Sequence, residues 1–92
     1  MTLRYLEALK YSHMTTAGTG IARDGQAKLH KVTVNSGSNT TLDVFNGPDV
    51  SSPLVAVVDC NTGGTYDYCG VPLASGLAIR LNDTADVTVI YE

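Results

Sequence analysis

Few side chains in this sequence have the type and spacing that catalysis or metal binding requires. The two cysteines, Cys60 and Cys69, lie nine residues apart, and neither belongs to a Cys-x-x-Cys pair. The two histidines, His13 and His30, each stand alone in the sequence. A structural zinc site needs four clustered Cys or His ligands, so the sequence does not predict one.

Spacing also argues against a disulfide between the cysteines. If residues 61–64 form a tight loop, Cys60 pairs near the start of the next strand, and Cys69 lies several residues farther along the ladder. The two Cα atoms of a disulfide must lie within about 7 Å of each other, so this register keeps the thiols apart. We expect two reduced, half-buried thiols, and a bridge formed through another register stays the alternative.

The acidic residues do not form a catalytic pattern either. Asp59, Asn61 and Asp67 could offer oxygen atoms to calcium, but they lack an ordered calcium-loop pattern. Turn Asp and Asn residues more often bond to the backbone. No second carboxylate stands at an interpretable spacing from Asp67 for acid–base chemistry, and no Gly-x-Ser-x-Gly motif occurs. We therefore predict no enzymatic activity, no cofactor and no metal.

Three tyrosines, Tyr66, Tyr68 and Tyr91, allow two interpretations. Together with Asp67 they could form a platform that binds a sugar. Tryptophan is absent, however, and alternate tyrosines on a strand usually pack at a core edge or a subunit contact. Core or interface packing is favoured, and carbohydrate binding stays the alternative.

The strongest structural pattern is the alternation of apolar and polar residues near the C-terminus. Leu77, Ile79 and Leu81 share one face of a predicted strand, and residues 87–91 repeat the pattern. The four residues between the runs, 82–85, are rich in turn formers. This arrangement predicts a β-hairpin.

Turn residues divide the preceding sequence into further short strands at intervals of about ten residues. In the run from 28 to 35, His30, Val32 and Val34 are expected on one face and Leu29 on the other. The apolar run at 54–59 is expected to be buried on both faces or to pack against a neighbour. The predicted strands cover residues 21–23, 28–35, 40–46, 54–59, 65–73 and the C-terminal pair.

Short, regularly spaced strands are typical of an all-β sandwich or barrel. The loops are too short for the crossover helices of a parallel α/β sheet. We predict an antiparallel β-sandwich, jelly-roll-like, with six to eight short strands.

The N-terminal residues follow a different pattern. Thr2, Tyr5, Leu6 and Leu9 recur on one face of a short helix. Such a helix is marginal in water and must dock on its own domain, a sister subunit or another protein. An extended arm and a frayed terminus stay open.

A glycine-rich segment, residues 15–20, follows this arm and is predicted to be a linker. We therefore divide the chain into an attachment arm at residues 1–16 and a β-sandwich domain at residues 17–92. The arm, for which the pattern favours a short helix, is the segment best suited to reach a neighbouring subunit.

Size and charge limit the possible functions. The chain has 92 residues, a net charge of −3 and only 16% charged residues. Without a basic patch it is not expected to bind nucleic acid, and without a run of about 20 apolar residues it is not expected to enter a membrane. Glu7 and Lys10 interrupt what would be a signal-peptide core, so we expect synthesis and retention in a cytoplasm until assembly. A domain this small has a thin core and often gains stability from a partner.

Five segments of the sequence carry a resemblance to known proteins: residues 29–35 (LHKVTVN), 41–46 (TLDVFN), 64–68 (GTYDY), 73–77 (LASGL) and 85–92 (ADVTVIYE). They resemble small all-β virion proteins of tailed bacteriophages, and the resemblance covers roughly residues 17–92. The resemblance implies capsid decoration (cement) proteins, head-fibre bases or tail accessory modules, which are often trimeric and lack enzymatic activity. It transfers no functional residue, because such families have contact surfaces rather than motif-defined sites.

Composition and resemblance together lead to one hypothesis and one alternative. The hypothesis is a non-enzymatic capsid cement protein, a homotrimer made in the host cytoplasm that binds the virion exterior and bridges capsomers. Its partner is the major capsid protein, and many weak contacts act together in such a shell. Apolar burial by Leu3, Tyr5, Leu6 and Leu9 is expected to supply the contact with the capsid or a sister subunit. The alternative is a receptor- or glycan-binding module of a head fibre or tail.

Overall fold

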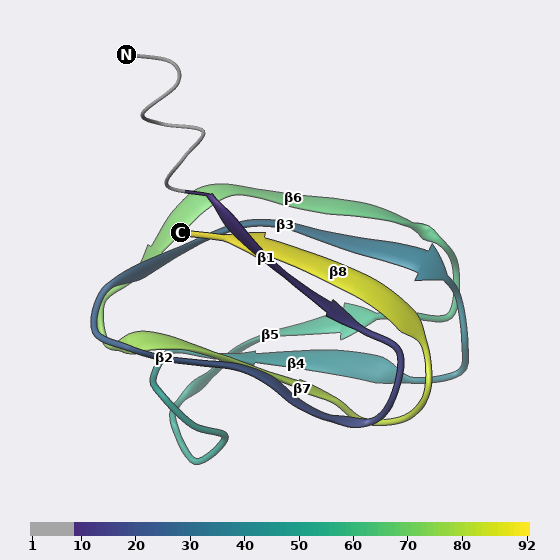
Figure 1. The fold of residues 1–92 in the computed structure, drawn as a ribbon, viewed down its shortest axis with the longest axis horizontal. Coiled ribbons are helices and arrows are strands. Elements are labelled where there is room, and N and C mark those ends of the chain that lie inside the picture. Colours follow the sequence, from purple (N-terminus) through teal and green to yellow (C-terminus); the bar gives the residue numbers. More distant parts are fainter. Residues whose placement is uncertain (1–8) are drawn as a thin grey trace.

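Two four-stranded antiparallel sheets stack face to face in the computed structural model, which describes residues 9–92 (Figure 1). The interleaved order of their strands is that of an eight-stranded jelly roll. The predicted all-β, antiparallel sandwich is therefore confirmed. Sheet A contains, in spatial order, β1 (Lys10–Met14), β8 (Asp86–Tyr91), β3 (Ala27–Ser36) and β6 (Gly64–Leu73). Sheet B contains β2 (Gly18–Asp24), β7 (Gly76–Leu81), β4 (Thr41–Phe45) and β5 (Leu54–Asp59).

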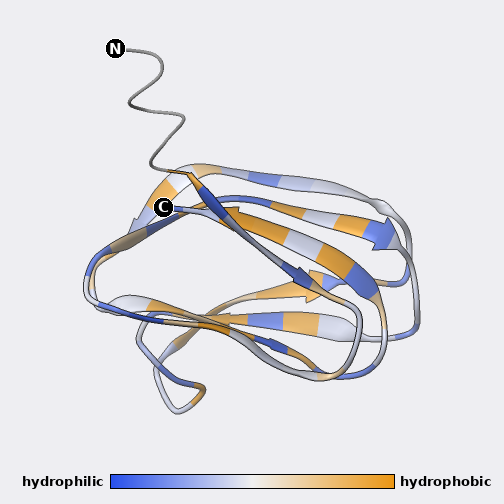
Figure 2. Ribbon diagram, viewed as in Figure 1, coloured by the Kyte–Doolittle hydropathy of each residue, from blue (hydrophilic) through white to orange (hydrophobic). Residues whose placement is uncertain are grey.

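A single hydrophobic core fills the space between the sheets. Alternate residues of each strand point toward the opposite sheet, so that apolar residues recur along strands such as β8 (Figure 2). Aliphatic side chains from both sheets form the core, as expected where two inner faces interdigitate. The fully buried members include Leu29, Val32, Val34, Val87 and Val89 of sheet A and Leu42, Val44, Val58, Leu77, Ile79 and Leu81 of sheet B.

The predicted C-terminal hairpin is wrong, because β7 and β8 belong to opposite sheets. β7 pairs with β2 and β4, whereas β8 pairs with β1 and β3. Residues 82–85 therefore carry the chain from one sheet to the other. At the start of this connection the backbone N–H of Asn82 donates to the carbonyl of Thr41 at 3.1 Å, and its side-chain amide donates to the Thr41 hydroxyl at 2.9 Å.

β3 differs from its predicted pattern because of a bulge. Leu29 is buried on the same side as Val32 and Val34, not on the opposite face. The register between β3 and β6 shifts at this point, where β6 carries extra residues. Two of these have left-handed backbone angles: Cys69 has φ 56° and Gly70 has φ 73°. Against β8, Leu29 and Lys31 lie opposite the consecutive residues Tyr91 and Ile90, so β3 itself has one extra residue here. This extra residue reverses the alternation of β3 and returns Leu29 to the core.

The first described residues form a strand rather than a helix. β1 pairs antiparallel with β8, with Tyr11 opposite Ile90. The helix prediction is therefore wrong for residues 10–14, which are extended but belong to sheet A rather than to a separate arm. The predicted linker at residues 15–20 is also shorter than expected, because β2 already begins at Gly18.

β5 lies at the edge of sheet B, beside β4 (Figure 1). The expected burial on both faces is wrong, because Val58 is buried but Leu54, Val55 and Val57 are exposed. The second option, packing against a neighbour, stays a prediction. Within residues 9–92 no helix is long and apolar enough to cross a membrane.

Candidate functional site

Leu9 is the one predicted contact residue inside the described part of the chain. It is half-buried and comes directly before β1. The other three, Leu3, Tyr5 and Leu6, lie outside the described residues. The structure therefore shows where the proposed arm joins the sandwich, which is at the β1 edge of sheet A.

A polar contact fastens β1 to the sandwich. Nε2 of His13 donates to Oδ1 of Asp86 in β8 at 2.6 Å, and the side-chain amide of Asn35 donates to the same oxygen at 3.1 Å. These two hydrogen bonds, the His13 bond first, lower the pKa of Asp86 below its ordinary value of 3.8. The carboxylate form of Asp86 is therefore the form that holds β1 in place.

Replacing His13 with alanine is expected to raise the pKa of Asp86 toward 3.8, because the stronger of its two donors is lost. A carboxylate whose pKa is lowered by folding stabilises the fold above its ordinary pKa, and this contribution disappears as the pH falls through the lowered pKa. Acid titration followed by NMR of the Asp86 carboxyl carbon measures the change. Asp67 is the internal control, because a backbone N–H unrelated to His13 lowers its pKa. Equal pKa values for Asp86 in both proteins would contradict the assignment.

The tyrosines do not form an exposed platform together. Tyr68 and Tyr91 pack against the core, while the hydroxyl of Tyr66 donates to the backbone oxygen of Asp59 at 2.9 Å. Asp67 accepts a hydrogen bond from the backbone N–H of Cys69 at 2.8 Å. Tyr66 thus links β6 to the end of β5, while the packing of Tyr68 and Tyr91 against the core agrees with the favoured core interpretation.

The two cysteines are both free, as expected from their spacing, but the predicted half-burial is wrong for each of them. Cys60 is buried in the core, and burial raises the pKa of its thiol, whereas Cys69 is exposed on the bulge of β6. Among the described residues no three His, Cys, Asp or Glu side chains lie close enough together to hold a metal ion. Asp59, one of the possible calcium ligands, accepts a hydrogen bond from the backbone N–H of Asn61 at 2.9 Å, so it serves the backbone of the turn.

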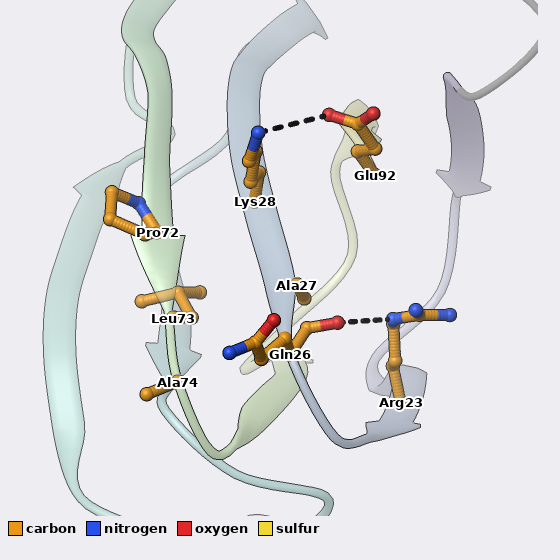
Figure 3. A pocket seen from close by; sticks show the side chains of 8 residues that line it. All are labelled: Arg23, Gln26, Ala27, Lys28, Pro72, Leu73, Ala74 and Glu92. Carbon is orange, nitrogen blue, oxygen red and sulfur yellow. Dashed lines mark hydrogen bonds and ion pairs between the residues drawn. The ribbon is translucent and has the colours of Figure 1, made fainter.

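A shallow depression of about 300 Å³ lies where the β2–β3 turn meets the end of β6 (Figure 3). Its charged groups are already engaged with nearby atoms. Nε of Arg23 donates to the carbonyl of Gln26 at 2.9 Å, and Nζ of Lys28 lies 4.0 Å from Glu92. Ala27, Leu73 and the other apolar residues line the remainder, so the depression offers a small apolar surface and no acid–base pair. The lining residues are Arg23, Gln26, Ala27, Lys28, Pro72, Leu73, Ala74 and Glu92.

The outer face of sheet B is polar at its centre. Asp43 accepts hydrogen bonds from Nη2 of Arg80 at 2.8 Å and from the side-chain amide of Asn82 at 3.1 Å. The guanidinium of Arg80 also lies 5.2 Å from the centroid of the Phe45 ring. These contacts occupy the middle of the outer face and pair Asp43 with Arg80. The exposed apolar side chains of sheet B lie instead along its edge strand, β5.

Three residues of β5, which we call the β5 stripe, form the clearest candidate contact surface. Leu54, Val55 and Val57 are 54%, 48% and 56% exposed. Residues 54–58 of β5 form an unbroken run of apolar residues along this edge of sheet B (Figure 2). The sequence shows the unbroken apolar run, but apolar runs usually indicate burial, and only the edge position of β5 reveals the exposure.

Comparison with known proteins supports the fold and no family. No protein-family model matches the chain, and no curated protein sequence matches it. The core of Drosophila NLP, whose structure is described for pentamer formation and histone binding, is similar with a TM-score of 0.57 and 10% identity over 91% of this chain and 95% of that one. The capsular polysaccharide assembling protein CapF of Staphylococcus aureus has a TM-score of 0.48 and 16% identity over 90% of this chain and 22% of that one. At such identities the likeness to NLP concerns the sandwich fold alone.

Proposed function

We propose that this protein is a non-enzymatic structural subunit of a tailed-phage virion, a capsid cement protein that binds the outer shell. The observation that carries the proposal is the β5 stripe. Half-exposed aliphatic side chains gathered on one sheet edge favour a contact surface over a solvent face.

Three further features support this role. The sequence segments described above resemble phage virion proteins, and jelly rolls recur among viral capsid proteins. Fold alone does not set function, so the surface carries more weight than the architecture. The structure of the similar NLP core is described for pentamer formation, which is an example of this architecture in an oligomer.

The copy number of the chain in purified virions tests the proposal. A cement protein is expected at about one copy, or about one third of a copy, per major capsid protein, because it follows the symmetry of the shell. About one copy per hundred would contradict the cement role and favour a fibre or tail module. Absence from virions would overturn the virion role altogether.

The double variant Leu6→Ser, Leu9→Ser is expected to lose most binding to stripped capsids, since apolar burial by the arm supplies the contact. The β-sandwich of this variant should remain folded by circular dichroism. Tyr11→Ser is the matched control, because Tyr11 is 73% exposed on the neighbouring strand and lies outside the predicted contact set. Unchanged capsid occupancy of the double variant would refute the contribution of the arm.

A further inference from the structure

The β5 stripe belongs to the outer face of sheet B. In the register with β4, Leu54 lies opposite Phe45 and Val57 lies opposite Asp43, and both β4 residues stand between positions that point into the core. Val55 is the extra residue of a bulge between these pairs, so the ladder is irregular at the start of β5. The side chains of the stripe, rather than free backbone groups, therefore form the surface available to a partner.

No part of residues 9–92 covers this surface. Leu54, Val55 and Val57 are all about half exposed, and residues 54–58 carry no charge. Asp59, which ends β5, is an exposed carboxylate beside the stripe. Neighbouring aliphatic side chains that stay exposed together are typical of a surface that another segment covers. The stripe thus calls for an apolar segment, with a cation at its end.

The chain itself contains such a segment outside the described residues. Residues 1–8, which we call the N-terminal segment, read Met-Thr-Leu-Arg-Tyr-Leu-Glu-Ala. Leu3, Tyr5 and Leu6 supply apolar side chains, and Arg4 supplies a cation for a carboxylate such as Asp59. One basic and one acidic side chain balance each other within the segment, so no net side-chain charge opposes its transfer to an apolar surface.

The N-terminal segment starts on the side of the sandwich opposite to β5. Short connections, residues 15–17 and 60–63, join β1 to β2 and β5 to β6, so these two pairs of edge strands lie on opposite sides. The route from β1 to the stripe of the same copy passes one sheet separation of about 10 Å and three strand spacings of about 4.8 Å, about 25 Å in all. Eight fully extended residues span at most about 26–29 Å. The segment would be used up on the way, so it can lie along the stripe of another copy but not along its own.

We propose that the N-terminal segment of one copy docks on the β5 stripe of a neighbouring copy. Leu3, Tyr5 and Leu6 cover the aliphatic side chains of the stripe. Each copy then gives one segment and receives another, which is a head-to-tail contact that produces closed rings or open chains. A ring of three copies is the trimer that the phage resemblance implies. Of the two partners expected for the arm, the capsid and a sister subunit, this inference selects the sister subunit.

The contact is small, so its affinity is expected to be modest. A single short segment buries less than the roughly 800 Å² per partner of a standard interface, and ordering it on binding costs free energy. We expect assembly to be detectable at about 100 µM protein. The inference rests on the proposed function for its biological role, since weak links become effective when many act in one shell.

A mixing experiment tests the contact, with sedimentation velocity of the full chain from about 10 µM to about 1 mM. The wild-type protein is expected to form oligomers as its concentration rises. The variant Leu3→Ser, Leu6→Ser keeps an intact stripe, and the variant Leu54→Ser, Val57→Lys keeps an intact segment. Each variant alone should stay monomeric. Their equimolar mixture should form dimers and nothing larger, because one intact segment meets one intact stripe and no second link can follow.

Tyr11→Ser is the control for these substitutions. Tyr11 is 73% exposed, lies on β1 and belongs to neither surface, so this variant should assemble like wild type. Circular dichroism checks that every variant is folded. If the double substitution in β5 prevents folding, Val57→Lys alone replaces it, because more than half of the Val57 side chain is already exposed.

Three outcomes would overturn the contact. The first is a wild-type protein that remains monomeric at about 1 mM. The second is a mixture of the two folded variants that stays monomeric, as a symmetric contact between two stripes or two segments would give. The third is a folded variant that assembles alone like wild type. Failure of the proposed function is a separate result: assembly in solution by a protein that is absent from virions would refute the virion role and leave the contact intact.

Discussion

Replacing Gly76 with alanine is expected to lower the free energy of unfolding by about 3 kcal/mol, from backbone strain and overpacking together. Gly76 begins β7 with φ 136°, an angle that residues with a Cβ rarely adopt. A Cβ at this position would also overlap the carbonyl oxygen of Arg23 and lie 3.0 Å from the carbonyl carbon of Gly47. Both neighbours are backbone atoms, so neither can move aside without distorting a strand or a turn.

Gly18→Ala is the matched control for this substitution. Gly18 has a similar φ of 140°, but no heavy atom lies within 4 Å of the position its Cβ would take. This variant should lose only the strain component, about 1–2 kcal/mol. Urea unfolding of both variants measures the difference, and equal losses would show that the overlap at Gly76 is relieved by movement of the backbone.

Leu42→Ala is expected to cost about 3 kcal/mol of unfolding free energy, because it leaves a cavity in the core. Leu42 is fully buried in β4, opposite Leu81 on one side and Val58 on the other. For a small domain this is a large share of a total stability of about 5–15 kcal/mol. The melting temperature should fall by roughly 10–20 °C.

Leu54→Ala gives the comparison for this core substitution. The same atoms are removed from the β5 stripe, where Leu54 is 54% exposed, so the loss should stay below about 1 kcal/mol. Thermal unfolding at low protein concentration keeps any pairing between copies from contributing. Similar losses in the two variants would mean that Leu54 is covered in solution.

The sequence was sufficient to predict the sandwich and the position of most strands, because alternation and turn residues are local signals. It was not sufficient to assign strands to sheets. Residues 77–81 and 87–91 each show one buried face, but in a sandwich both sheets do, so alternation cannot separate a hairpin from a connection between sheets. The decisive contacts join Asn82 to Thr41, about forty residues away in the sequence.

Bulges and edges limited the remaining predictions. One extra residue of β3 opposite β8 changed the side of the strand on which Leu29 lies, and the apolar–polar alternation of residues 28–35 does not mark this bulge. The exposure of the β5 stripe was not predicted, for a related reason. An apolar strand looks the same in sequence at the centre and at the edge of a sheet, and only the strand order decides whether its valines are exposed.

The position of β8 between β1 and β3 has a consequence for synthesis on the ribosome. β1 is made early, but its partner in the sheet is the last of the eight strands. At about 5–20 residues per second, β1 waits for about 4–15 s before β8 is translated. During this time the inward valines of β3 have no complete sheet to join. Sheet A therefore cannot complete its pairing of β1 until β8 has left the ribosome, so the sandwich closes late in the synthesis of this domain.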